Sequence, residues 1–204
     1  MILNEHSINV ECLNLMDRVE DKRTAILEAT LRLISKNGFH GTAMSQVAKE
    51  AGVSAGIIYH YFDGKDDLIN ELYRTIKRRF GQAVLESCEQ DQPLKAQIRQ
   101  MLGIMIGYYI QRPQESAFVE QYTRSPYYRP EIEAEVSQYY LPVIECFQRA
   151  QEEMIIKDLP APVIGALTLD VATSLAQKQA AGFLDLTDEL IERIIEASWE
   201  AIRQ

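Results

Sequence analysis

Cysteine and tryptophan are scarce in this sequence of 204 residues, which holds three of the first and one of the second. The cysteines, Cys12, Cys88 and Cys146, lie far apart, form no Cys-x-x-Cys pair and have no histidine at metal-ligand spacing beside them. A disulfide framework or a zinc site needs such spacings, so their absence argues against both. We expect three buried thiols, no metal and no cofactor.

Long apolar runs are also missing. Polar residues break every run well short of the ~20 residues needed to cross a bilayer. Residues 1–20 carry Glu5, His6 and Glu11 where a secretion signal needs a basic start and an apolar centre. No repeat and no stretch rich in proline, glycine or serine indicates a disordered arm. We therefore expect a cytoplasmic globular protein that does not associate with membranes.

Catalytic constellations are absent as well. The sequence shows no nucleophile with a neighbouring base, no metal cluster and no glycine loop that would cradle a phosphate. The acids Glu131, Glu133 and Glu135 are typical of a solvated helix face. We do not expect an enzyme.

Positive charge is short overall, since 21 Lys and Arg stand against 30 Asp and Glu for a net charge of −9, which argues against binding a polyanion. The distribution reverses that argument. Residues 21–80 hold ten Lys and Arg against seven Asp and Glu, whereas residues 81–204 hold ten against nineteen. A mildly basic segment followed by an acidic body suits a two-part DNA-binding regulator.

Apolar residues recur at helical spacing almost throughout, and no alternating strand is flanked by hairpin turns, so we expect an all-α fold. Asn37-Gly38 should end the first helix, and Thr42, Ser54 and Thr187 should cap later ones. Residues 1–20 are an N-terminal extension that either lengthens the first helix or lies as an arm. About nine helices are expected, over residues 21–36, 44–51, 54–62, 65–87, 93–111, 114–123, 130–156, 160–181 and 187–203.

The stretch from Met44 to Phe62 has the features of a helix-turn-helix, in which two short helices cross at a steep angle. Ala48 is small enough for the second helix to approach, and Gly52, four residues later, tolerates the positive φ of the turn. Ser54 should cap the recognition helix. An ordinary helical hairpin would explain the Ala-x-x-x-Gly spacing alone. The apolar residues expected to fill the wedge between the two helices are Val47, Val53 and Ile58.

These residues and their neighbours resemble the N-terminal domain of the TetR family of repressors over about residues 22–70. The motif spacing is kept across four helices without a gap. Position 43 departs from the family, because it is alanine where a second serine or threonine is common, so a cap or contact is missing or shifts to Ser45. The resemblance implies a three-helix helix-turn-helix head over residues 21–67 and a larger helical ligand-binding and dimerisation domain over residues 68–204. It is carried by Arg23, Ile26, Leu27, Gly38, Phe39, Thr42, Val47, Ala48, Ala51, Gly52, Val53, Ser54, Gly56, Ile58, Tyr59, His60, Tyr61, Phe62, Lys65, Asp66, Asp67 and Leu68.

The resemblance also implies two kinds of DNA contact. Hydroxyl, ring and ammonium groups at helix starts and on the recognition helix should bind phosphates, which anchors the protein without reading sequence. The exposed first turn of that helix should contact bases. Its small and apolar side chains offer no bidentate hydrogen bonds, so thymine methyls and DNA shape should contribute more, with A·T pairs under Ile57. The phosphate set is Thr42, Ser54, Tyr59, His60 and Lys65, and the base set is Gln46, Ala55, Gly56 and Ile57.

In the body, flexible and amphipathic side chains of the fifth to seventh helices fit an adaptable ligand cavity, although plain core explains the same stripes. Glu115 and Glu120 near these aromatics would suit a cation, and a solvated helix face explains them as well. Apolar, aromatic and acyl-conjugate ligands therefore stay open. Stripes on the last two helices fit a four-helix dimer interface or again a core. The pocket set is Met101, Met105, Tyr108, Phe118, Tyr122 and Tyr140, and the dimer set is Leu167, Val171, Leu175, Leu190, Ile194 and Trp199.

As a function, the resemblance implies a repressor that binds a palindromic operator in double-stranded DNA as a homodimer and leaves it when a small-molecule inducer binds. Half-sites lie about 34–36 Å apart, so a small pivot of the fourth helix would spoil simultaneous docking. The alternatives are an activator or architectural DNA binder without ligand response, and a helical ligand carrier or enzyme.

Overall fold

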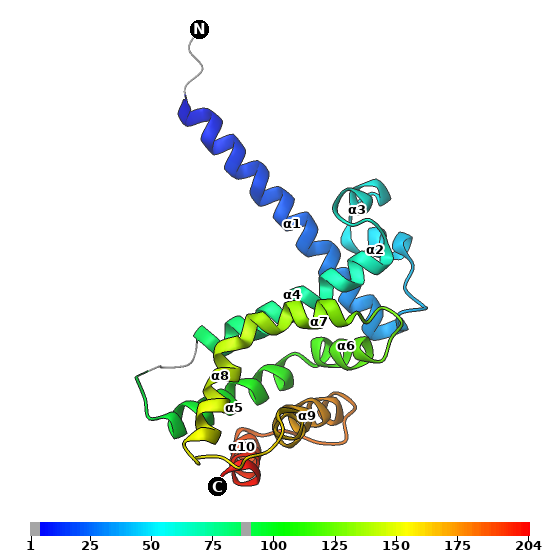
Figure 1. Cartoon of the computed structure of the whole chain (residues 1–204). Helices are drawn as coiled ribbons and strands as arrows, with labels where there is room; N and C mark the ends of the chain where they lie inside the picture. Colours follow the sequence, from blue (N-terminus) through cyan, green and yellow to red (C-terminus); the bar gives the residue numbers. More distant parts are fainter. Residues whose placement is uncertain (1–4, 87–90) are drawn as a thin grey trace. The chain divides into compact units, whose positions relative to one another are not determined.

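The computed structural model describes the backbone of residues 5–86 and 91–204, and side chains from residue 21 onward in these ranges. The described residues form ten α-helices and a short 3-10 helix, with one isolated β-bridge between Ile156 and Arg203. The all-α prediction is confirmed. None of the described helices has the length and apolar character needed to span a membrane. The helices (Figure 1) are α1 (Glu5–Asn37), α2 (Met44–Ala51), α3 (Ala55–Tyr61), α4 (Lys65–Glu86), α5 (Leu94–Gln111), α6 (Pro113–Thr123), α7 (Pro130–Ser137), η1 (Gln138–Tyr140), α8 (Leu141–Glu152), α9 (Ala161–Ala180) and α10 (Asp188–Ile202).

The first helix, α1, is longer than the predicted helix over residues 21–36. It begins at Glu5, so the backbone of the N-terminal extension continues α1 rather than forming a separate arm. It ends as expected, because Gly38 adopts a φ of 69° after Asn37. Of the three cysteines, Cys146 is buried as predicted, and the side chains of Cys12 and Cys88 lie outside the described residues.

The single helix predicted over residues 130–156 was wrong. It is divided into α7, η1 and α8, and α8 ends at Glu152. Pro142 lies in the first turn of α8, where its ring removes an amide donor, and Tyr140 leaves helical geometry with φ −130° and ψ 22°. Beyond α8, Met154 takes a positive φ of 55°. Pro142 indicated a break at this point of the sequence, but the helical periodicity of the apolar residues led to the prediction of one continuous helix.

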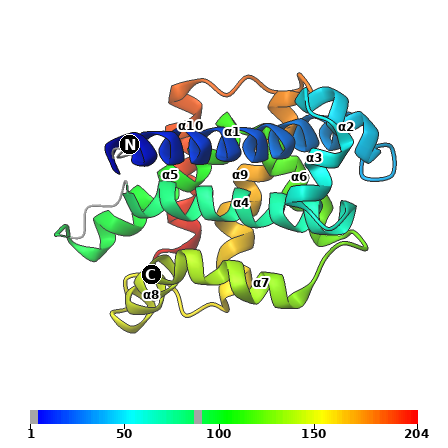
Figure 2. The same cartoon turned by 90° about the horizontal axis from the view of Figure 1, so that it is seen from above.

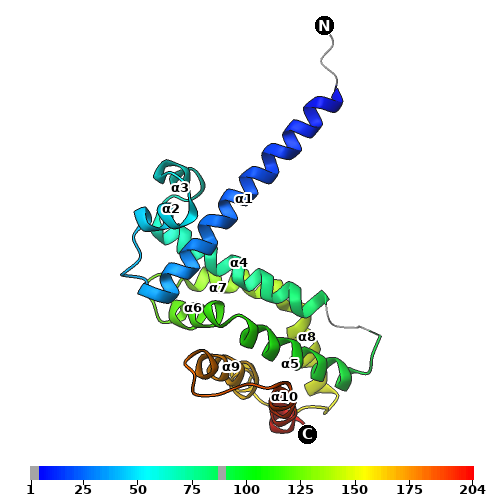
Figure 3. The same ribbon diagram turned by 180° about the vertical axis from the view of Figure 1, so that it is seen from behind.

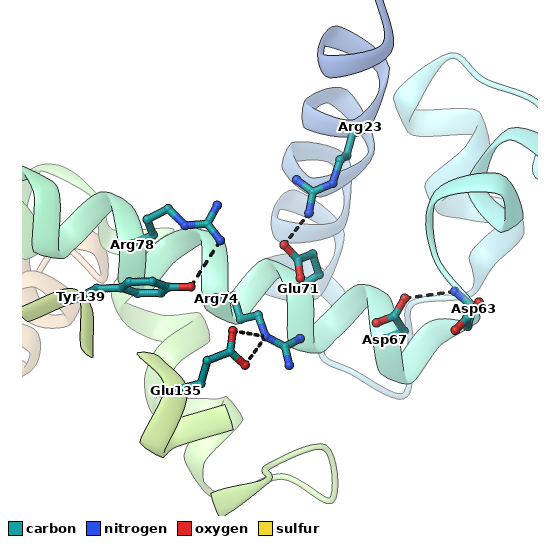
Figure 4. Close-up of polar contacts among 8 residues, drawn as sticks. All are labelled: Arg23, Asp63, Asp67, Glu71, Arg74, Arg78, Glu135 and Tyr139. Atoms are coloured by element: carbon teal, nitrogen blue, oxygen red, sulfur yellow. Dashed lines mark hydrogen bonds and ion pairs between the residues drawn. The ribbon is translucent and has the colours of Figure 1, made fainter. Parts of the chain in front are cut away.

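The chain divides into two compact units, Met1–Leu72 and Tyr73–Gln204, and α4 contributes its first eight residues to the first unit and the rest to the second. In the first unit α1 packs against α2 and α3, which also contact each other (Figure 2). An ion pair joins Arg23 of α1 to Glu71 of α4 (Figure 4). The Arg23 guanidinium also lies 5.7 Å from the ring centroid of Phe62. The buried apolar residues of this unit include Ile26, Leu27, Ile34, Val47, Ile58, Phe62 and Leu68.

The second unit is built around α5. This helix packs against α6, α8, α9 and α10, and α9 also contacts α6 and α10 (Figure 3). A helix surrounded in this way must be apolar on most of its surface. Its buried residues are Leu94, Ile98, Met101, Leu102, Met105, Ile106, Tyr108, Tyr109 and Ile110.

Polar contacts join the later part of α4 to α7 and η1. The Tyr73 hydroxyl donates to Glu133 Oε2 at 2.5 Å, and Arg74 Nε donates to both carboxylate oxygens of Glu135 at 3.1 and 2.9 Å. Figure 4 shows the Arg74 contact and a weaker one from Arg78 to the Tyr139 hydroxyl at 3.3 Å. Backbone proximity adds to them, since a Cβ at position 81 would lie 2.6 Å from the Tyr139 carbonyl oxygen. Only glycine fits at that approach.

Candidate functional site

The turn between α2 and α3 is a tight C-terminal cap. Gly52 adopts φ 67° and ψ 28°, and its N–H donates to the Lys49 carbonyl at 3.3 Å. The Val53 N–H donates to the Ala48 carbonyl at 3.0 Å, which completes a Schellman motif. Val47, Ala48 and Ile58 are buried in the wedge and Val53 is half-buried. The positive φ predicted for Gly52 is confirmed.

The recognition helix of this motif, α3, presents its first turn outward. Ser54 accepts a hydrogen bond from the Ile57 N–H at 3.4 Å and caps the helix as predicted. Ala55, Gly56 and His60 are exposed, as is Tyr59, with 58% of its surface accessible. Ile58 is fully buried and fixes the opposite face. An exposed first turn with unpaired helix N–H groups and a positive dipole end favours contact with anions such as phosphates.

Two of the predicted phosphate residues use polar groups inside the first unit. Thr42 is buried, and its hydroxyl donates to the Gly38 carbonyl at 2.9 Å, so Thr42 is not the cap of α2. The ammonium of Lys65 donates to the Phe39 carbonyl at 2.5 Å. Both therefore hold the turn that follows α1. The exposed candidates for phosphate contact are Ser54, Tyr59 and His60.

The cap of α2 falls on Ala43, which has no side-chain acceptor. The Gln46 side chain compensates from the other direction, because its Oε1 accepts the Ala43 N–H at 2.9 Å. This is one half of a capping box, so the side-chain cap of α2 is missing, and a phosphate contact from Ser45 stays a prediction. Gln46 was predicted to assist base contact, and it stands on the exposed side of α2 with its carbonyl oxygen engaged.

The second unit contains a cavity of about 460 Å³, a volume usual for small-molecule sites. Helices α4, α5, α6 and α9 line it, and most of the lining side chains are polar. The cavity is thus unlike the apolar pocket that the sequence predicted. Its lining residues are Lys77, Tyr109, Ser116, Val119, Glu120, Thr123, Arg124, Leu169, Asp170, Thr173, Ser174 and Gln177.

None of the six predicted pocket residues belongs to that lining. Five are buried and Tyr140 is half-buried. The Tyr108 hydroxyl donates to Glu115 Oε2 at 2.6 Å, and Tyr122 stacks on Tyr73 with ring centroids 4.0 Å apart. Burial raises the pKa of Tyr122 to about 12. These side chains pack as core in this structure, and their part in a ligand cavity stays a prediction. The buried predicted residues are Met101, Met105, Tyr108, Phe118 and Tyr122.

The acids that suggested a cationic ligand already have partners. Glu115 is buried, accepts the Tyr108 hydroxyl and lies 3.5 Å from Arg79. Glu120 accepts the Gln177 amide and pairs with Arg124 at 3.2 Å. Because these carboxylates are satisfied within the chain, they do not support a cation site.

The predicted dimer residues divide into two groups. Trp199 is 2% exposed and belongs to the core of the second unit, where Lys95 and Arg99 lie 5.7 and 5.9 Å from its ring centroid. It therefore faces its own chain. The other five are half-buried on α9 and α10, namely Leu167, Val171, Leu175, Leu190 and Ile194.

Sequence reasoning missed the polar lining of the cavity. Lys77 lies at helical spacing between Tyr73 and Phe80, inside the apolar stripe of α4. A charged residue in such a stripe could have indicated a polar site at this position. Ser116 is a second one, fully buried between Glu115 and Phe118 on α6. Neither belongs to a motif that a single sequence would reveal.

Two short helices joined by a Schellman turn, in a chain whose described residues are almost entirely helical, have the geometry of a helix-turn-helix, the motif of many DNA-binding proteins. Two family models match this chain, "Bacterial regulatory proteins, tetR family" over residues 26–72 and "Tetracyclin repressor-like, C-terminal domain" over residues 93–203. An uncharacterized HTH-type transcriptional regulator of Haemophilus influenzae is 30% identical over 185 residues, which cover 90% of this chain and 97% of that protein.

Solved structures agree. A TetR family transcription regulator from Marinobacter aquaeolei VT8 matches with a TM-score of 0.87 and 26% identity, covering 93% of this chain and 99% of that one. A putative TetR family regulator from Vibrio parahaemolyticus matches with a TM-score of 0.75 and 33% identity, covering 90% and 99%. The chain belongs to the TetR family of helix-turn-helix transcriptional regulators.

Proposed function

We propose that this chain is a cytoplasmic repressor that binds a palindromic operator as a homodimer and is released by a small-molecule inducer. The exposed first turn of α3 supports the DNA-binding part. Ser54, Tyr59 and His60 supply phosphate contacts there, and Ala55, Gly56 and Ile57 meet the base edges. Gln46 assists from α2.

The test of DNA binding is a fluorescence-anisotropy titration against the upstream region of the chain's own gene at two salt concentrations. Tyr59→Phe removes one hydroxyl and should weaken binding to every DNA sequence by about fivefold, corresponding to roughly 1 kcal/mol. Ile57→Ala should instead change the preferred operator. Tyr61→Phe, on the same helix but half-buried, is the matched control. Binding that is unspecific, or that does not weaken with salt, would refute the proposal.

The dimer part is supported by the half-buried apolar stripe on α9 and α10. Leu175→Arg and Ile194→Arg should each place a charge in a two-fold interface and yield monomers in sedimentation equilibrium. Glu192→Arg, an exposed position on α10, is the control for added positive charge. If both variants still form dimers, the dimer interface lies on another surface of the chain.

The proposed response to a ligand is supported by the polar cavity of the second unit, because an architectural DNA binder does not need a ligand cavity. A reporter fused to the operator distinguishes the remaining alternatives. Expression should rise in a deletion strain if the chain represses, and should fall if it activates.

A further inference from the structure

The strongest unexplained feature of the second unit is Lys77. Its ammonium lies 4.9 Å from the ring centroid of Tyr140, 5.9 Å from that of Phe80 and 6.0 Å from that of Tyr73, and the residue lines the cavity. Among the described residues no carboxylate lies within ion-pair distance of it and no acceptor takes its protons. Burial lowers the pKa of Lys77, while the charge of Glu133 raises it.

A charged amine in this position is costly. Ring faces attract a cation, but they do not replace the hydrogen bonds that three ammonium protons make in water. The carboxylate of Glu133 does not supply them, since it accepts the Tyr73 hydroxyl at 2.5 Å and Tyr140 also bonds to it. Lys77 is thus a cavity-lining residue whose ammonium protons find no acceptor among the described residues.

Ser116 provides an independent second observation. Its hydroxyl is fully buried, has no hydrogen-bond partner in the part of the chain that the structure describes, and lines the same cavity from α6. A buried hydroxyl without a partner usually marks a group that a ligand or water satisfies. Tyr109 adds a phenol whose pKa burial raises, so its proton stays in place at neutral pH. Lys77, Ser116 and Tyr109 thus contribute three hydrogen-bond donors to the lining of the cavity.

The remaining charges limit how much negative charge a ligand carries. Glu120 is held by Arg124 and Gln177, so this group is neutral as a set. Asp170 of α9 also lines the cavity and is exposed, and Glu133 acts on Lys77 from α7. With Lys77 as the unpaired cation among the described lining residues, and with these acids nearby, a ligand with a single negative charge is favoured over a dianion.

We propose that the cavity binds a small polar monocarboxylate, whose carboxylate pairs with Lys77 and whose polar groups reach Ser116. This inference rests on the proposed ligand-responsive function and gives its inducer a chemical class. A carboxylate offers the acceptors that the ammonium lacks and neutralises its charge. The lining of threonine, serine and glutamine side chains favours a hydroxylated or amide-bearing body over a long acyl chain.

The test is isothermal titration calorimetry with three carboxylates, lactate, benzoate and hexanoate, each paired with its own primary amide, and with inorganic phosphate. We expect saturable binding of at least one carboxylate, at least tenfold weaker binding of the matching amide, and lactate ahead of benzoate and hexanoate. Lys77→Met should reduce the carboxylate affinity at least tenfold and Ser116→Ala should reduce it less. Lys36→Met, an exposed lysine of α1, should behave as wild type.

Equal binding of carboxylates and amides, a preference for phosphate, or no carboxylate binding up to millimolar concentration would each overturn the inference. The wild-type comparison needs no variant, so a folding defect in Lys77→Met does not affect it. The same carboxylates are then added to the operator complex. Lys77-dependent binding that leaves DNA affinity unchanged would contradict the proposed induction and leave the ligand class standing.

Discussion

The alanine at the N-cap of α2 offers a direct test of how the head is stabilised. Ala43 has φ −93° and ψ 150°, the extended geometry of an N-cap residue, and it is exposed. Gln46 already supplies one half of a capping box by accepting the Ala43 N–H. Ala43→Ser would supply the other half, because the serine Oγ can accept the Gln46 N–H.

The expected gain follows from these contacts. Serine in place of alanine at an N-cap contributes about 1 kcal/mol, within a range of roughly 0.5–2 kcal/mol. No rearrangement of the backbone is required, since Ala43 already has the dihedral angles that the cap needs. A stabilisation of about 1 kcal/mol corresponds to a roughly fivefold smaller opening constant for α2.

Native-state hydrogen exchange measures that opening directly, and it resolves α2 from the second unit. The amides of Val47 and Ala48 should exchange about fivefold more slowly in Ala43→Ser. Ala55→Ser is the matched control, because it adds a hydroxyl to an exposed position of α3 that Ser54 already caps. Adding Gln46→Ala should remove part of the gain, since the two halves of a capping box are coupled.

Unchanged or faster exchange in Ala43→Ser would refute this account of the cap. Equal slowing in Ala55→Ser would also refute it, because the effect would then not depend on the N-cap.

Three further predictions concern single residues. Gly52→Ala should destabilise the first unit by about 1–2 kcal/mol, because φ 67° is strained for alanine. Urea unfolding followed by circular dichroism measures this loss, and Gly56→Ala, at an exposed position of α3, should not show it. Equal losses in both variants would contradict the turn geometry. Lys77→Met should stabilise the ligand-free protein more at neutral pH than near pH 10.5. Since burial lowers the folded-state pKa of Lys77, its penalty is present below the usual value of 10.5 and fades as pH rises towards it; a pH-independent difference in Tm would show that charge is not the cause. Trp199→Phe should lower stability by more than about 1 kcal/mol and keep the sedimentation mass unchanged, because Trp199 is core.

Much of the fold could be predicted because helical periodicity and capping residues act locally. Gly38, Gly52, Ser54 and Thr187 all end or begin helices as expected, and Thr187 accepts the Leu190 N–H at 3.3 Å. The break before α8 was missed because a long apolar period outweighed one proline.

The candidate sites were harder because side-chain partners are set by tertiary structure. Thr42 has the right residue type for a cap, yet its hydroxyl bonds backward to Gly38 and the cap falls one residue later. Trp199 belongs to an apolar stripe that a dimer and a core would share, and only packing decides between them. Lys77 and Ser116 come together through α4 and α6, which no local pattern connects.

The position of the only tryptophan has a practical consequence for spectroscopy. Trp199 is buried in the core of the second unit, and the first unit contains no indole. Intrinsic emission excited at the indole band therefore reports one half of the chain, while circular dichroism sees the helices of both. If the two signals change at different temperatures or denaturant concentrations, the head and the body unfold as separate cooperative units, and this can be read from the natural sequence without any attached dye.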